Sequence, residues 1–242
     1  MPELPEVETT IKGLKPIINS TIINIKIHTY KLRFYIPQNI SLIKKTKIKN
    51  IKRKGKYIII VLKNKFSIIV HLGMSGRLRL IKKSKYKYTK HDHFIIKTNK
   101  NHTLIFNDSR KFGFVDYVKS CKILQTKYFL KLGIDALSSS LNEKYLFSRI
   151  NESIIPIKQI LLNQNIIAGI GNIYASEILF NAKISPLKKG KDLKIDDCKK
   201  IVISIRKILK KAIKSGGSTL RDYISADGTV GNFQNNFKVY NK

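Results

Sequence analysis

The hydrophobic pattern of this chain changes from strand-like to helical near residue 120, and this change restricts the folds open to it. Between residues 21 and 118, short β-branched segments such as KYIIIVL and HTLIFND alternate with turn-forming stretches such as KGK and TNKN. Such segments are typical of antiparallel strands in a sandwich or barrel. From residue 122 onward apolar residues recur at helical spacing, as in IPIKQILLNQ and GNIYASEILFNA. The order of the two patterns predicts an α+β fold, with a β domain followed by a helical domain.

A further helix is expected before the strands, over residues 3–18, where apolar residues also recur at helical spacing. The expected domains are therefore residues 1–121, a helix and an antiparallel β-sandwich, and residues 122–242, which are helical. Within the second domain, ILQTKYFLKLG (residues 123–133) is one helix candidate. The last long helix should end at Gly216 and Gly217, because glycine is a common helix stop.

The net charge limits the classes of molecule that the chain is expected to bind. The chain has 48 Lys and Arg against 15 Asp and Glu, a formal charge of +33. A bias toward lysine from an AT-rich genome could explain part of this excess. Charge of this size attracts polyanions, so nucleic acid is the leading partner, with an anionic membrane surface as the alternative.

The cysteines and the N-terminus indicate a cytoplasmic protein. Cys121 and Cys198 lie far apart, and neither belongs to a C-x-x-C pair that would indicate a zinc site or a disulfide framework. The chain has neither a signal-peptide pattern nor an apolar run long enough to span a membrane. A reducing cytoplasm fits these features best, and no membrane association is expected.

The first eight residues, MPELPEVE, are acidic and rich in proline in an otherwise basic chain. Removal of Met1 would leave Pro2 with a secondary amine, and an α-amino group with a pKa near ~8 is partly neutral at physiological pH. A neutral amine can attack an electrophilic carbon such as a sugar C1′ and form an iminium ion, while Glu3 moves protons. A simpler explanation is that proline and acidic residues are common at helix starts.

Three glycine-containing motifs favour the catalytic explanation of the first eight residues over the structural one. HLGMSGRL, NDSRKFGF and IIAGIGNIYASEIL each have a structural explanation when taken alone, and the third could bring backbone N–H groups close to a phosphate. Together with MPELPEVE, RKGKY, KHDH and SGGSTLRDY, in this order, they resemble the bacterial formamidopyrimidine-DNA glycosylases. The resemblance runs from residue 1 to about Tyr240.

The resemblance implies a bifunctional DNA glycosylase and AP lyase of base excision repair, which excises oxidised purines from duplex DNA and cuts the strand. It implies an N-terminal helix and β-sandwich joined to a domain with a helix–two-turns–helix motif. By position, Pro2 is the nucleophile, Glu3 the acid/base and Lys56 the proton donor in β-elimination. Glu6 matches a position in the lesion pocket.

The resemblance also implies a set of DNA contacts. The target base must leave the stack, and three side chains are expected to fill the void that it leaves. These are Met74, Arg110 and Phe112. The expected DNA contacts are His71, His91, Arg110 and Asn172. Tyr223 lies in SGGSTLRDYISADG, which matches a loop that closes over the flipped base.

One family feature is expected to be missing. Relatives usually continue into a zinc finger with two C-x-x-C pairs, whereas this sequence stops at FKVYNK, so no zinc ligands and no other cofactor are expected. Two alternatives to the enzyme remain open from the residues: a finger-less relative that binds damaged or abasic DNA with little turnover, and a general basic nucleic-acid-binding protein. As in the family, the chain is expected to act as a monomer on double-stranded DNA.

Overall fold

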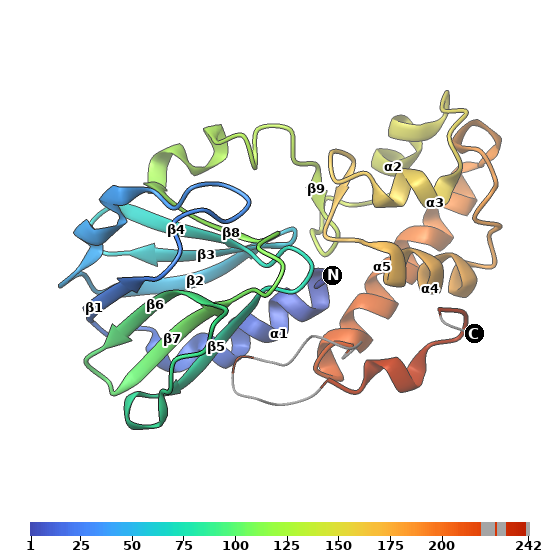
Figure 1. Ribbon diagram of the computed structural model, residues 1–242. Helices are drawn as coiled ribbons and strands as arrows, with labels where there is room; N and C mark the ends of the chain where they lie inside the picture. Colours follow the sequence, from blue (N-terminus) through green and yellow to red (C-terminus); the bar gives the residue numbers. More distant parts are fainter. Residues whose placement is uncertain (219–225, 227–230, 241–242) are drawn as a thin grey trace.

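A computed structural model describes residues 1–218, 226 and 231–240 of the chain (Figure 1). It contains an antiparallel sandwich followed by a helical part, with the N-terminus between them (Figure 1). The α+β fold predicted from the change in hydrophobic pattern is therefore confirmed.

Two four-stranded antiparallel sheets form the sandwich, in the orders β1-β6-β7-β5 and β2-β3-β4-β8. Their inward-facing Ile, Val, Leu and Phe side chains form one core, as the alternation of apolar residues requires. The strands are β1 (Ile22–Ile27), β2 (Ile48–Lys54), β3 (Tyr57–Leu62), β4 (Phe66–His71), β5 (Arg77–Lys82), β6 (Asp92–Thr98), β7 (His102–Asn107) and β8 (Phe114–Lys119).

The second part packs its helices around a separate apolar core. The α-helices of the chain are α1 (Leu4–Leu14), α2 (Glu143–Ile150), α3 (Ile157–Leu162), α4 (Asn172–Ala182) and α5 (Ile195–Lys214). Two short segments, β9 (Ile134–Asp135) and β10 (Ile167–Ala168), pair in parallel. The 3-10 turns are Lys15–Ile17, Gln38–Ile43, Lys83–Lys85, Ser120–Gln125, Gly190–Asp192 and Phe233–Asn236. In the described ranges, no helix has the length and apolar character needed to cross a membrane.

Two helix predictions need correction. The helix expected over residues 3–18 ends at Leu14 and continues as a 3-10 turn, because Pro16 has no backbone N–H to extend the α-helical pattern. The helix expected over residues 123–133 is absent, and only a 3-10 turn forms at its start. Its aromatic residues instead cover the outer face of a sheet, where Tyr128 stacks on Phe114 with ring centroids 4.5 Å apart.

Helix α1 joins the two cores. Leu4 is buried in the core of the helical part, whereas Val7 and Leu14 are buried in the core of the sandwich. The backbone N–H of Leu4 donates to the carbonyl of Gly169, at 3.0 Å. A Cβ at Gly169 would lie 2.6 Å from Leu4 Cδ1, so glycine is what allows this close approach. The first residues of the chain are thus fixed between the two parts of the molecule.

Candidate active site

Glu3 is the N-cap residue of α1, and its carboxylate also binds the start of a second helix, α4. Its carboxylate accepts the backbone N–H groups of Gly171 at 2.6 Å and Ile173 at 2.9 Å. Both donors lie at the start of α4, where unpaired N–H groups and the helix dipole favour an anion. The sequence motif predicted that this hairpin could present N–H groups to a phosphate. In the structure these two N–H groups are engaged by Glu3 instead.

Glu6 lies behind Glu3 and is completely buried. One carboxylate oxygen accepts the backbone N–H of Glu3 at 2.9 Å. The other accepts the Tyr174 hydroxyl at 2.7 Å and the backbone N–H of Ser218 at 2.8 Å. Burial raises the pKa of Glu6, and these hydrogen bonds act against that rise. Glu6 therefore connects the start of α1 with the segment that follows α5.

Lys56 follows a glycine turn between β2 and β3 and is also buried. Gly55 adopts φ +56° there and donates its N–H to the carboxylate of Asp135 at 2.9 Å. Arg53 donates to the same carboxylate and, at 2.8 Å, to Glu8 on α1. The turn that carries Lys56 is thus bonded to both the first helix and the helical part.

Glu3 and Lys56 shift each other's titration within this buried region. Burial raises the pKa of Glu3 to about 7, although the nearby Lys56 cation and the two N–H donors of α4 act in the opposite direction. Burial lowers the pKa of Lys56, while the carboxylates of Glu3 and Glu6 act to raise it. A carboxyl group that titrates near neutral pH can both donate and accept a proton under physiological conditions.

These groups line a cavity of about 420 Å³, which we call the N-terminal cavity. It is lined by Met1, Glu3, Lys56, Leu162, Gln164, Gly171, Asn172, Ile173 and Tyr240. Pro2 is buried next to it, and with Met1 attached its nitrogen is part of a peptide bond. Removal of Met1 would free this nitrogen and would also remove one wall of the cavity.

A second cavity of about 640 Å³, the loop cavity, also borders Met1. It is lined by Met1, Arg33, His71, Gly73, Met74, Arg110, Lys111 and Phe112. The structure thus places four of the side chains expected to contact DNA or fill the void, His71, Met74, Arg110 and Phe112, around one cavity. Since Met1 lines both cavities, the N-terminal residue borders both groups of site residues.

His71 is neutral in this setting. Burial lowers its pKa to about 4, and the charges of Lys56 and Arg33 act in the same direction. Its Nδ1 accepts the backbone N–H of Gly73 at 3.1 Å, which leaves the proton on Nε2. His71 can therefore donate a hydrogen bond to a phosphate oxygen without carrying a positive charge.

The remaining predicted residues lie in different places. His91 is half-buried, and its carbonyl accepts the backbone N–H of Asp108, so it lies beside the 108–113 loop without lining either cavity. Asn172 is exposed at the start of α4 and lines the N-terminal cavity. Tyr223 lies outside the described residues.

The sequence did not indicate several residues that line the two cavities. Arg33 faces the loop cavity from a segment without regular structure and belongs to none of the recognised motifs. Gln164 lines the N-terminal cavity and organises the hairpin before α4, since its side chain accepts from Gly169 N and donates to the carbonyl of Ile170. Tyr240 closes the same cavity from the C-terminal segment. For Arg33 and Gln164 we find no local sequence signal.

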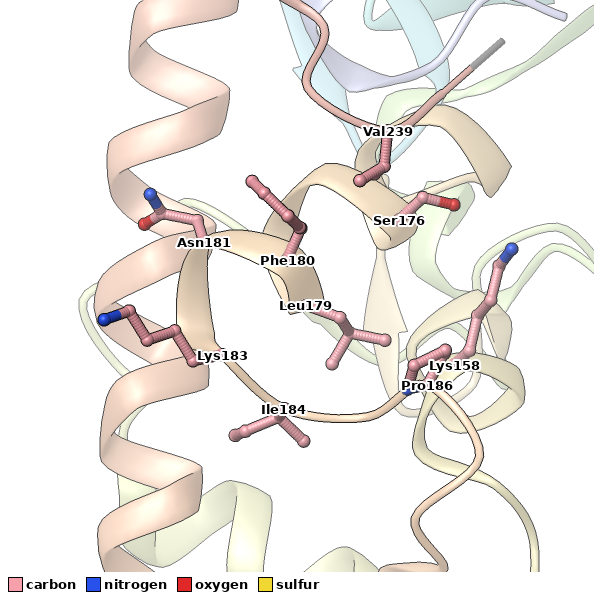
Figure 2. Close-up of a pocket in the computed structure, with 9 residues that line it drawn as sticks. All are labelled: Lys158, Ser176, Leu179, Phe180, Asn181, Lys183, Ile184, Pro186 and Val239. Carbon is pink, nitrogen blue, oxygen red and sulfur yellow. The ribbon is translucent and has the colours of Figure 1, made fainter. Parts of the chain in front are cut away.

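Another cavity, of about 680 Å³, lies at the far end of α4 (Figure 2). Leu179, Phe180 and Ile184 give it an apolar lining, and Lys158 and Lys183 lie at its edge (Figure 2). No carboxylate lines it. It therefore lacks the acid/base groups of the N-terminal cavity.

The described residues do not fit the zinc site that the family resemblance implies. Cys121 is exposed in a 3-10 turn beside the sandwich, whereas Cys198 is buried in α5. Across residues 1–218, 226 and 231–240, no three His, Cys, Asp or Glu side chains gather in a way that could hold a metal ion.

Comparison with known proteins agrees with this arrangement. Residues 1–115 match the formamidopyrimidine-DNA glycosylase N-terminal domain, and residues 132–224 match the formamidopyrimidine-DNA glycosylase H2TH domain. The chain is 44% identical to the formamidopyrimidine-DNA glycosylase of Zymomonas mobilis and 43% identical to that of Rickettsia felis. All of this chain aligns with 89% of the first relative and 88% of the second.

Solved structures agree as well. The fold matches Lactococcus lactis Fpg in complex with N7-benzyl-Fapy-dG DNA, with a TM-score of 0.90 and 36% identity over 100% of this chain and 88% of that one. It also matches the same enzyme in complex with abasic-site DNA, with a TM-score of 0.89 and 35% identity over 99% and 88% of the two chains. The chain belongs to the formamidopyrimidine-DNA glycosylase family.

Proposed function

We propose that this chain excises oxidised purines from duplex DNA and cleaves the strand at the resulting abasic site, with Pro2 as the nucleophile. One observation carries the proposal. The N-terminal residue, a carboxyl group with a pKa of about 7 and a buried ammonium group share one cavity of about 420 Å³. An amine, an acid/base and a cation around one cavity are the groups that imine chemistry at a sugar carbon requires.

In the proposed reaction, the Pro2 nitrogen attacks C1′ as the bond between C1′ and the damaged base breaks. Glu3, protonated in part at neutral pH, donates a proton that opens the sugar ring. In β-elimination a proton passes from C2′ of the iminium to the now ionised Glu3, the C3′–O bond breaks, and Lys56 donates a proton to the leaving 3′ phosphate. A protein amine, carboxyl or ammonium group carries each of these steps, and the proposed setting is the bacterial cytoplasm.

The loop cavity supports the proposed handling of DNA. Met74 and Phe112 are exposed at 43% and 44%, although both are apolar, and Arg110 extends beside them. Such side chains are suited to enter a stack and fill the space left by a flipped base. His71 and Asn172 would donate to phosphates next to the lesion, and the charge of +33 would attract the duplex.

Borohydride trapping on a duplex with 8-oxoguanine tests the chemistry. The processed protein should form a covalent adduct, and Pro2→Gly should not. A matched control adds one residue before Pro2, which blocks the amine and leaves every other side chain unchanged. It should bind the duplex without forming an adduct. Mass spectrometry of the processed protein should show that Met1 is absent.

Other outcomes favour the other functions. Lesion-selective binding without cleavage at any excess of protein would indicate a damage-binding protein without turnover. Equal affinity for damaged and intact duplexes, with a steep dependence on salt, would indicate a general nucleic-acid-binding protein. Failure to trap an adduct on both lesion and abasic DNA would reject the proposed chemistry.

A further inference from the structure

Two loops carry the side chains that are proposed to enter the duplex, and both cross between the sheets at one end of the sandwich. Residues 72–76 join β4 to β5 and carry Met74, and residues 108–113 join β7 to β8 and carry Arg110 and Phe112. The strands pair at both ends of the loops, His71 with Phe114 and Arg77 with Asn107. Strand register therefore fixes where the loops start and end, but not their central residues.

A single buried carboxylate connects the centres of the two loops. Asp108 is completely buried, and its Oδ1 accepts the hydroxyl of Ser75 at 2.6 Å and the backbone N–H of Arg110 at 3.2 Å. Its Oδ2 accepts the backbone N–H of Gly113 at 2.8 Å. The Ser75 hydroxyl in turn accepts the N–H of Arg110, at 3.2 Å. One side chain thus accepts hydrogen bonds from both loops, and this joins their centres.

The backbones of the loops are also in direct contact. A Cβ at Gly73 would lie 2.4 Å from the nitrogen of Gly113, and a Cβ at Gly113 would lie 2.6 Å from the carbonyl oxygen of His71. Gly73 has φ +63°, a conformation that glycine adopts without strain. No side chain separates the loops here, so one loop has little room to move without the other.

The tips above this base are free of such restraints. Met74 and Phe112 are about half-exposed, and the guanidinium of Arg110 lies 4.6 Å from the centre of the Phe112 ring. The Asp108 cluster, defined as Asp108, Ser75 and the N–H groups of Arg110 and Gly113, thus supports three exposed tips on one rigid base.

We propose that Asp108 and Ser75 are positioning residues that join the two loops into one unit, so that Met74, Arg110 and Phe112 enter the duplex together. The inference rests on the proposed function, because it concerns how the same site engages DNA. Neither residue needs to touch DNA. Their role is to set the spacing between the Met74 tip and the Arg110–Phe112 tip.

Ser75→Ala is the most informative variant, because it removes one hydroxyl shared by Asp108 and Arg110 and leaves the backbone contacts. Ser67→Ala is its matched control, since the Ser67 hydroxyl is also buried but pairs with Ser120 in the sandwich. Single-turnover excision of 8-oxoguanine from duplex DNA should fall about 10-fold in Ser75→Ala, as expected for the loss of one buried hydrogen bond. Trapping on a single-stranded abasic oligonucleotide, which has no stack to fill, should stay within about 2-fold.

A double-mutant cycle distinguishes positioning from general destabilisation. If Ser75 acts by placing Met74, the variant with both Ser75→Ala and Met74→Ala should be hardly slower than Met74→Ala alone. Additive losses would overturn the proposal, as would a Ser75→Ala rate on duplex DNA equal to that of Ser67→Ala. Equal losses on duplex and single-stranded DNA would also overturn it.

Fluorescence provides a readout that needs no chemistry. A 2-aminopurine base opposite a tetrahydrofuran abasic site in a duplex should change its emission when the wild-type loops enter, and change less with Ser75→Ala or Asp108→Asn. A wild-type signal without borohydride trapping would reject the proposed chemistry and leave the loop coupling supported. Absence of a wild-type signal, or an equal signal from all variants, would overturn the coupling.

Discussion

The two cavities beside Met1 are built in opposite ways. The N-terminal cavity depends on buried ionisable groups, and its carboxylate is held by backbone N–H groups from the other part of the molecule. The loop cavity depends on exposed side chains, and its buried restraints lie below them, around Asp108. The groups proposed to carry the chemistry are buried, whereas the side chains proposed to enter a duplex are exposed.

The side chains of the two cavities also differ in how they affect the stability of the fold. A buried carboxyl group interacts strongly with neighbouring charges, but removing it from water destabilises the fold. An exposed methionine or phenylalanine contributes little to folding and can therefore be selected for what it does to DNA. Substitutions near Glu3 should thus affect both stability and chemistry, whereas substitutions at the loop tips should affect only the engagement of duplex DNA.

Gly171→Ala should have the largest effect. Gly171 has φ −129°, which alanine adopts readily, but a Cβ there would lie 2.4 Å from the carboxyl carbon of Glu3. Glu3 must then move away from the start of α4. Displacement of a reacting group by about 1 Å can cost about 100-fold in rate. We expect single-turnover excision to fall at least that far, while Asn181→Ala, at the other end of α4, keeps the wild-type rate. A near-normal rate for Gly171→Ala would mean that Glu3 need not be held by α4.

The second effect is a dependence of stability on pH. The pKa of Glu3 is about 7 in the folded chain and has an ordinary value of 4.5. Because the folded value is raised, the protonated form of Glu3 adds stability below pH 4.5, and this stability is lost as the pH rises toward 7. At about 1.4 kcal/mol per pKa unit, the loss is up to about 3 kcal/mol.

Glu3→Gln isolates this contribution. The free energy of unfolding of the wild type, measured with urea at fixed temperature, should fall relative to that of Glu3→Gln between pH 4.5 and 7. A constant offset between the two proteins is expected as well, because glutamine has one acceptor oxygen for two N–H donors. The test is therefore how the difference in unfolding free energy between the two proteins changes with pH. A difference that stays flat over this range would show that Glu3 ionises normally.

The regular parts of the fold were predictable from local pattern. Alternation of apolar residues indicated the sandwich, and the 3.6-residue period indicated α4 and α5. The prediction failed at residues 123–133, where an apolar, aromatic segment covers a sheet instead of forming a helix. The local pattern indicates that such a segment is buried, but it does not indicate which part of the fold it packs against.

The candidate site was predictable only where motifs matched known relatives. Glu3, Lys56 and Asn172 lie together as the resemblance implies, but the sequence alone gave no sign that Glu3 would bond to N–H groups 168 and 170 residues away. A contact between a side chain and a distant backbone leaves no periodic signal. The same holds for the bond from Ser75 to Asp108, which only the crossing of two loops brings together.

Phe112→Ala should have the smallest effect on the protein itself and so gives the sharpest comparison between the cavities. Its ring is 44% exposed, and its contact with the guanidinium of Arg110 is of a kind that contributes about 0.5 kcal/mol at exposed sites. The free energy of unfolding should therefore change by less than about 0.5 kcal/mol. Excision from duplex DNA should nevertheless fall about 10-fold, the equivalent of about 1.4 kcal/mol.

Phe180→Ala is the matched control, since Phe180 is similarly exposed but lines the cavity at the far end of α4 (Figure 2). If both variants lost activity equally, exposed aromatic area in general, rather than its position on the loop, would explain the loss.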